Sequence, residues 1–132
     1  MSEENVEIVR RAAKALASRD RTTWLAVNAP ELELVPLADW PDPGALGPAA
    51  IWDFYLDVFD ILGPLAADNA EVIDAGGDKV LMRYRSDASG RSSGAAVEFD
   101  YSAVLTVRQG KVHRIQWFAD HTEALEAAGL SE

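Results

Sequence analysis

Hydrophobic residues recur every three or four positions at the start of the chain, which predicts a helix. A serine and two glutamates follow Met1, and such side chains suit the positive end of a helix. Four apolar residues follow at helical spacing, namely Val6, Val9, Ala13 and Leu16. We expect this helix to run to about Arg19. A short second helix, capped by Asp20, should end near residues 29–30.

Acidic and apolar residues then alternate from Glu31 to Leu37, as they do in a strand with one exposed face. Residues 38–48 contain three proline and two glycine residues, which predict a loop. Further along the chain, four more strands are expected, over residues 67–74, 79–87, 95–108 and 111–120. Gly76-Gly77 and Gln109-Gly110 mark tight turns between these strands.

Two more helices complete the predicted element order. Residues 48–62 are rich in aromatic and aliphatic side chains, with Pro48 tolerated in the first turn. The charged residues of this segment fall on one stripe, so we expect the helix to be mostly buried. Asp120 to Glu123 form a capping-box pattern that opens a last helix, and Gly129 ends it.

The Gln109-Gly110 turn also suggests a register for the last hairpin, because a two-residue loop would pair Val107 with Val112. Counting by twos adds four pairs to that face: Leu105 with Arg114, Ala103 with Gln116, Tyr101 with Phe118, and Phe99 with Asp120. The opposite face then holds Thr106 with His113, Val104 with Ile115, and Ser102 with Trp117. A β-bulge in the hairpin would invert this assignment.

In this register both faces of the hairpin carry large apolar groups, which a sheet open to water on one side would not need. Helices can cover one face. The other face, with Val104, Ile115 and Trp117, needs a different partner, and we expect a homodimer to form through it.

Composition narrows the classes of function. The chain has 132 residues, which predicts a single domain over residues 1–132. Its formal net charge of −10 disfavours binding to nucleic acid or to anionic membranes. The acidic N-terminus does not resemble a signal peptide and no apolar run could span a bilayer, so we expect a soluble, cytoplasmic protein.

Metal and cofactor chemistry have little support in the sequence. The chain has no cysteine, which excludes a disulfide, a thiolate nucleophile and a cysteine-ligated zinc. His113 and His121 are its only histidines, and neither has an acidic partner at ligand spacing. We find no phosphate-binding glycine loop, nucleophile elbow or dinucleotide fingerprint. We therefore expect no metal and no cofactor.

Four segments carry a resemblance to a known superfamily. They are Arg19-Asp20, the stretch from Gly47 to Tyr55, Gly110-Lys111-Val112, and the stretch from Phe118 to Leu130. With the element order, they make the whole chain similar to the nuclear-transport-factor-2-like superfamily, and most of all to its SnoaL-like branch. The resemblance implies an α+β fold in which a cone-shaped, strongly bent, mainly antiparallel sheet carries helices on its concave face around one pocket.

The resemblance also implies a use for the pocket. Ketosteroid isomerases, scytalone dehydratase, polyketide cyclases and limonene-epoxide hydrolase use such an apolar cavity, whereas other members only bind or transport. The expected function is therefore cofactor-independent proton transfer on a small hydrophobic oxygenated molecule by an isomerase, cyclase, dehydratase or hydrolase. The alternatives are a binding protein and a dimerisation module with the same cavity.

Asp120 resembles the acid that closes the last strand in limonene-epoxide hydrolase, and it is the candidate general acid or base. The alternative is that Asp120 only caps the last helix. Tyr101 and Tyr55 are candidate donors to a ligand oxygen, or core residues with a satisfied hydroxyl group. Five residues complete the predicted ligand site: Trp40, Trp52, Phe99, Gln116 and Phe118. Trp40 lies in the proline-rich loop, where it would cover the pocket or seal the core.

Overall fold

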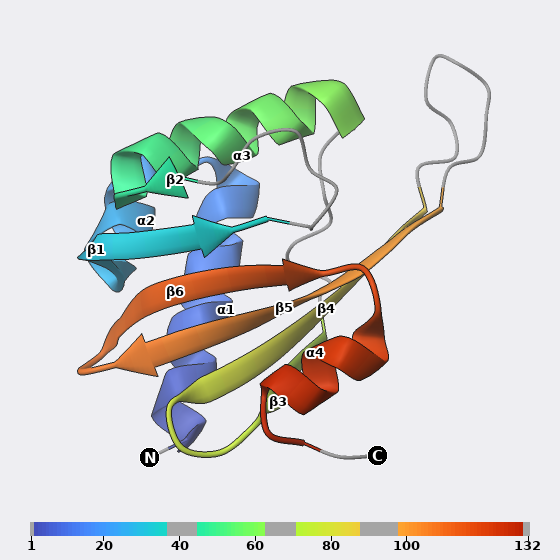
Figure 1. Cartoon of the computed structure of the whole chain (residues 1–132). Helices are drawn as coiled ribbons and strands as arrows, with labels where there is room; N and C mark the ends of the chain where they lie inside the picture. Colours follow the sequence, from blue (N-terminus) through green and yellow to red (C-terminus); the bar gives the residue numbers. More distant parts are fainter. Residues whose placement is uncertain (1, 37–44, 63–70, 88–97, 131–132) are drawn as a thin grey trace.

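The structure of the chain is a computed structural model that describes residues 2–36, 45–62, 71–87 and 98–130 (Figure 1). It contains the helices α1 (Ser2–Ser18), α2 (Arg21–Val27), α3 (Pro48–Leu62) and α4 (His121–Ala127). Its strands are β1 (Asn28–Val35), β2 (Ala45–Leu46), β3 (Glu71–Asp74), β4 (Lys79–Asp87), β5 (Glu98–Arg108) and β6 (Lys111–Phe118). No described helix is long and apolar enough to cross a membrane.

The strands form one mixed sheet in the order β2-β1-β6-β5-β4-β3. β1 and β6 run parallel, and all other neighbours are antiparallel. Helices α1, α2 and α3 cover the concave face of the curved sheet, and α4 lies on the opposite, convex face (Figure 1). The predicted α+β cone is thus confirmed, with the last helix outside it.

Two helix ends set the position of α2. Arg19 adopts a positive φ of 62°, and Asp20 N–H donates to the carbonyl of Ala15, which ends α1 in a tight turn. The Asp20 carboxylate then accepts hydrogen bonds from the side chain and the backbone N–H of Thr23, and these bonds lower the pKa of Asp20. The predicted cap is confirmed, and it brings Trp24 onto the concave face.

The last hairpin contains a β-bulge, so the predicted register is wrong beyond its first pairs. Val107 pairs with Val112 as expected, but Thr106 pairs with Arg114, which leaves His113 as an extra residue on β6. The one-residue shift turns every later side chain of β6 to the other face relative to β5. Leu105 therefore pairs with Ile115 and Ala103 with Trp117, and these pairs lie on the concave face.

This register removes the predicted dimer surface. Ile115 and Trp117 are 5% and 4% exposed and pack beneath α1, α2 and α3. Val104 lies on the convex face, where it packs with Leu81 against Ala124 of α4. The three residues Val104, Ile115 and Trp117 thus do not share a face. A homodimer itself stays a prediction.

Element boundaries differ from the predicted ones at three places. β1 begins at Asn28 and includes Pro30, which lies where the pairing of β1 with β6 is irregular. Ala45–Leu46 form a short edge strand, β2, inside the predicted loop. The last strand ends at Phe118 because Asp120 begins a helix cap. The predicted strand residues 67–70 and 95–97 lie outside the described residues.

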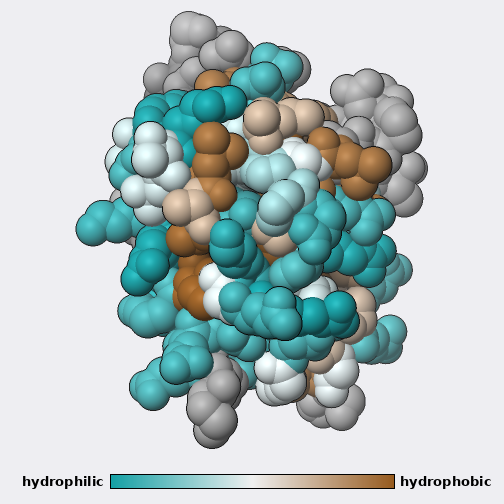
Figure 2. Space-filling view, turned by 90° about the vertical axis from the view of Figure 1, so that its left-hand side faces the viewer, coloured by the Kyte–Doolittle hydropathy of each residue, from teal (hydrophilic) through white to brown (hydrophobic). Residues whose placement is uncertain are grey.

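The surface agrees with the acidic composition. Hydrophilic residues cover most of the face seen in Figure 2, and hydrophobic residues appear there in small scattered groups. In the described part of the chain, Leu46 is the one large hydrophobic residue that is exposed, at 74%. The large apolar side chains of the described residues are therefore concentrated between the sheet and the helices.

Candidate functional site

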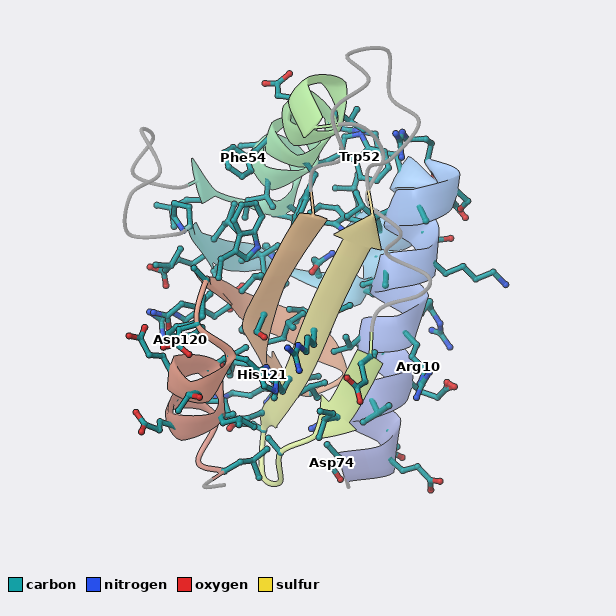
Figure 3. The ribbon with its side chains drawn as sticks, turned by 90° about the vertical axis from the view of Figure 1, so that its right-hand side faces the viewer. Arg10, Trp52, Phe54, Asp74, Asp120 and His121 are labelled. Carbon is teal, nitrogen blue, oxygen red and sulfur yellow. The ribbon has the colours of Figure 1, made fainter. Side chains whose placement is uncertain are left out.

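Aromatic side chains from three elements meet on the concave face. Trp24 of α2 lies 5.6 Å from Trp52 and 6.5 Å from Tyr55, measured between ring centroids. On the other side of the group, Trp117 of β6 lies 5.7 Å from Tyr55 and 5.6 Å from Phe54. α3 supplies the central rings, because Trp52, Phe54 and Tyr55 lie within four consecutive residues of this helix. Figure 3 shows Trp52 and Phe54 on it.

A small cavity lies beside this group, between the sheet and the helices. Its volume is about 20 Å³. Its lining consists of Val9, Ala12, Ala13, Leu16, Trp24, Asn28, Tyr55, Met82, Leu105 and Ile115. Asn28 contributes an amide group to this lining and Tyr55 a hydroxyl group. The other lining side chains are apolar, apart from the indole N–H of Trp24. Such a wall of apolar groups with a few polar ones is typical of a small-molecule site.

Tyr55 is 5% exposed, and its hydroxyl oxygen accepts a hydrogen bond of 3.3 Å from the indole N–H of Trp117. Burial raises the pKa of Tyr55 to about 12, while the bond from Trp117 acts in the opposite direction. The phenol therefore stays protonated at neutral pH. It can donate a hydrogen bond to an oxygen atom, but it is not a base.

Asp120 does not lie at the cavity. It is exposed, and its carboxylate accepts a 2.8 Å hydrogen bond from the backbone N–H of Thr122 as the N-cap of α4. Figure 3 shows Asp120 at the start of α4, on the far side of the sheet from α1. Its predicted position on the pocket face, beside Phe99, is wrong, because that position depended on a hairpin without a bulge.

The cap role predicts a specific pattern of stability. Asp120→Ala should lower the free energy of unfolding by about 1 kcal/mol, because the N–H of Thr122 loses its partner. Asp120→Asn should stay within a few tenths of a kcal/mol of the wild type, since Asn caps helices about as well as Asp. Urea denaturation of both variants measures this. Equal losses in the two variants would show that the negative charge, and not the cap, matters.

The other predicted site residues are scattered. Trp52 is 4% exposed and belongs to the aromatic group. Gln116 and Phe118 lie on the convex face, opposite to the expected one, and Phe118 packs near α4. Trp40 lies outside the described residues, as do the side chains of Tyr101 and Phe99. The structure therefore brings Tyr55 and Trp52 together and leaves Gln116, Phe118 and Asp120 elsewhere.

Two polar contacts escaped the sequence analysis. Asn28 is 3% exposed and lines the cavity, although the sequence indicated only the end of a helix there. On the convex face, the Ser102 hydroxyl lies 2.7 Å from Nδ1 of His121, and Ser102 is fully buried. This second contact attaches the start of α4 to β5. Because Ser102 is buried, it is not an accessible nucleophile in this arrangement.

The histidines take part in separate contacts. His113, the bulge residue, lies 3.6 Å from the carboxylate of Glu31, and His121 contacts Ser102. Within the described ranges, no group of three or more histidine, aspartate and glutamate side chains could hold a metal ion.

Comparison with known proteins identifies the family. The sequence profile of the SnoaL-like domain family matches residues 9–115, which include every residue that lines the cavity. The chain belongs to the SnoaL-like domain family. The curated protein sequences contain no match to this SnoaL-like chain.

Solved structures agree with the SnoaL-like assignment. An NTF2-like protein from Burkholderia xenovorans is 26% identical, with a TM-score of 0.73 over 97% of each chain. TerC, co-crystallized with polyporic acid, is 25% identical with a TM-score of 0.69, over 96% of this chain and 98% of TerC. A candidate SnoaL-like polyketide cyclase from Mesorhizobium loti is 19% identical with a TM-score of 0.59, over 84% of this chain and 95% of its own. The predicted superfamily is confirmed.

Proposed function

We propose that this SnoaL-like protein binds a small hydrophobic, oxygen-bearing molecule between the concave face of the sheet and helices α1, α2 and α3. One observation carries the proposal: the cavity there is apolar apart from a few polar groups, among which are the side chains of Asn28 and Tyr55. An apolar wall favours a hydrophobic ligand, and a few fixed polar groups select its orientation. The structural similarity to TerC, which was crystallized with polyporic acid, supports a small organic ligand.

The size of the cavity sets a condition on this binding. A volume of about 20 Å³ holds one water molecule, so a larger ligand enters only when lining side chains change rotamer. Met82 is a suitable residue for such a change, because its unbranched thioether adapts to different shapes. We therefore propose binding by adjustment of the concave face.

Conversion of the ligand by proton transfer is the second candidate function, and Tyr55 favours it. A buried neutral phenol can donate a hydrogen bond to a ligand carbonyl and stabilise negative charge that develops on the oxygen. An isomerase or cyclase reaction also needs a base, and the described lining contains no carboxylate or histidine. Binding is therefore the first proposal, and catalysis would need a base from another part of the chain.

Ligand binding can be tested by native mass spectrometry of the purified protein, followed by thermal shift with any molecule that it retains. We expect the ligand to raise the melting temperature of the wild type by mass action. Ala13→Leu places extra bulk in the lining and should abolish the shift. Ala50→Leu, on the exposed side of α3, is the matched control and should keep it.

Overpacking by Ala13→Leu can itself cost about 1–3 kcal/mol. Tyr55→Phe is the second variant, because it removes only the hydroxyl group. It should keep the fold and weaken binding of an oxygen-bearing ligand by about tenfold, which corresponds to the net value of one hydrogen bond. A ligand whose thermal shift is the same in all four proteins does not occupy this cavity, and that result would overturn the proposal.

A further inference from the structure

Asn28 is the first residue of β1 and follows α2 directly. Its amide nitrogen donates a 2.6 Å hydrogen bond to the carbonyl of Trp24, at the end of α2. This bond fixes the orientation of the amide, since only the nitrogen can donate to a carbonyl oxygen. The amide oxygen, Oδ1, consequently points away from Trp24 O.

Oδ1 of Asn28 is buried and has no hydrogen-bond partner among the described residues. An acceptor left in this state costs about 1–3 kcal/mol, so buried acceptors in native proteins nearly always have a partner. Asn28 lines the 20 Å³ cavity, and the side chain of Tyr55 lines it too. A partner for Oδ1 can therefore come from the cavity itself.

The volume and the chemistry of the cavity specify this partner. A space of about 20 Å³ exceeds the roughly 10–15 Å³ that one water molecule needs, and a water also requires polar neighbours. Because the unpaired atom is an acceptor, the group that fills the space has to be a donor. A carbonyl, an ether or an epoxide oxygen cannot satisfy Oδ1, whereas a hydroxyl or N–H group can.

We propose that the cavity is a donor-binding subsite, in which a group with an O–H bond donates to Asn28 Oδ1. In the free protein this group is one buried water molecule. In the ligand complex it is a hydroxyl group of the ligand, an alcohol, enol or phenol, which replaces the water. The second half rests on the proposed function, because it assumes that a small molecule reaches the concave face.

The water is tested without any ligand, by water magnetic relaxation dispersion on the wild type and two variants. Asn28→Leu keeps the branched shape of the side chain but removes the acceptor, together with the donor to the carbonyl of Trp24. Val9→Ile keeps Asn28 and adds a methyl group to a fully buried lining residue. Each variant should lose one long-lived water relative to the wild type. An unchanged dispersion amplitude in Val9→Ile, which should fold normally, would overturn the water site.

The preference for a donor is tested with phenol and its methyl ether, anisole, as probes. Nitrogen-labelled indole N–H signals report binding, because Trp117 and Trp24 belong to the concave face. The wild type should bind phenol at least about tenfold more tightly than anisole, since anisole leaves Oδ1 without a partner. Asn28→Leu should remove this preference or reverse it.

The two experiments separate this inference from the proposed function. Equal binding of phenol and anisole would overturn the donor subsite and leave a hydrophobic binding protein. Binding of neither probe would count against a site for small aromatic molecules, and the relaxation measurement would then decide the water site alone. A lost water together with a phenol preference that depends on Asn28 supports both halves of the proposal.

Discussion

Ile115→Asp is expected to unfold the chain, whereas Gln116→Asp should leave it folded. Ile115 is 5% exposed and lines the cavity under three helices, so an aspartate there would bury a charge without a partner. We expect a loss of at least about 4 kcal/mol, which approaches the whole stability of a domain at the lower end of the usual range, about 5 kcal/mol. Gln116 is half-buried on the convex face, where a carboxylate can reach water and should cost less than about 1 kcal/mol.

Far-ultraviolet circular dichroism and urea denaturation of the two variants provide the measurement. Both variants introduce an aspartate at neighbouring positions of the same strand, so the new residue and the net charge are matched. A hairpin without a bulge would place Ile115 on the convex face and Gln116 on the concave one. If Gln116→Asp unfolded and Ile115→Asp did not, the observed register would be wrong.

The elements of the fold could be predicted from local signals. Helix α3 begins and ends at the predicted residues 48 and 62, and the capping roles of Asp20 and Asp120 are confirmed. The Gln109-Gly110 turn also forms as expected, with a positive φ at both residues. Each of these features depends on a few neighbouring residues, so it can be predicted from a short stretch of sequence.

The faces of the last hairpin could not be assigned by counting from its turn, because one bulge residue inverts everything beyond it. Both faces of this hairpin are covered, by α1 to α3 on one side and partly by α4 on the other, so alternation of apolar and polar residues is weak. The sequence does contain a signal for the bulge. Val112, Ile115 and Trp117 lie three and then two positions apart, and the step of three contains the extra residue His113.

The candidate site was harder to predict than the fold. The predicted position of Asp120 depends on a register that the bulge changes, whereas Tyr55 is predicted only as a possible donor to a ligand oxygen. Asn28 has no chemical signal of its own, since an asparagine two residues before a proline, here Pro30, is typical of a turn. Its burial depends on β1 starting there and pairing with Val112, a contact between residues far apart in the sequence.

Trp24→Ala is expected to have the second largest effect, a loss of about 3–5 kcal/mol in the free energy of unfolding. Trp24 is 2% exposed and contacts Trp52 and Tyr55, so removing the indole leaves a large void between α2 and α3. The surrounding side chains come from different elements and can collapse only in part. Thermal and urea denaturation should both show the loss, with a melting temperature lower by roughly 10–20 °C.

Two controls separate packing from helix stability. Thr22→Ala changes an exposed position of the same short helix and should stay within about 0.5 kcal/mol of the wild type. Trp24→Phe keeps an aromatic ring and should lose about 1–2 kcal/mol, less than the alanine variant. If Trp24→Ala and Thr22→Ala had similar small effects, the aromatic group would not support the concave face. Because the carbonyl of Trp24 also holds the amide of Asn28, a variant that shifts α2 should weaken ligand binding as well as stability.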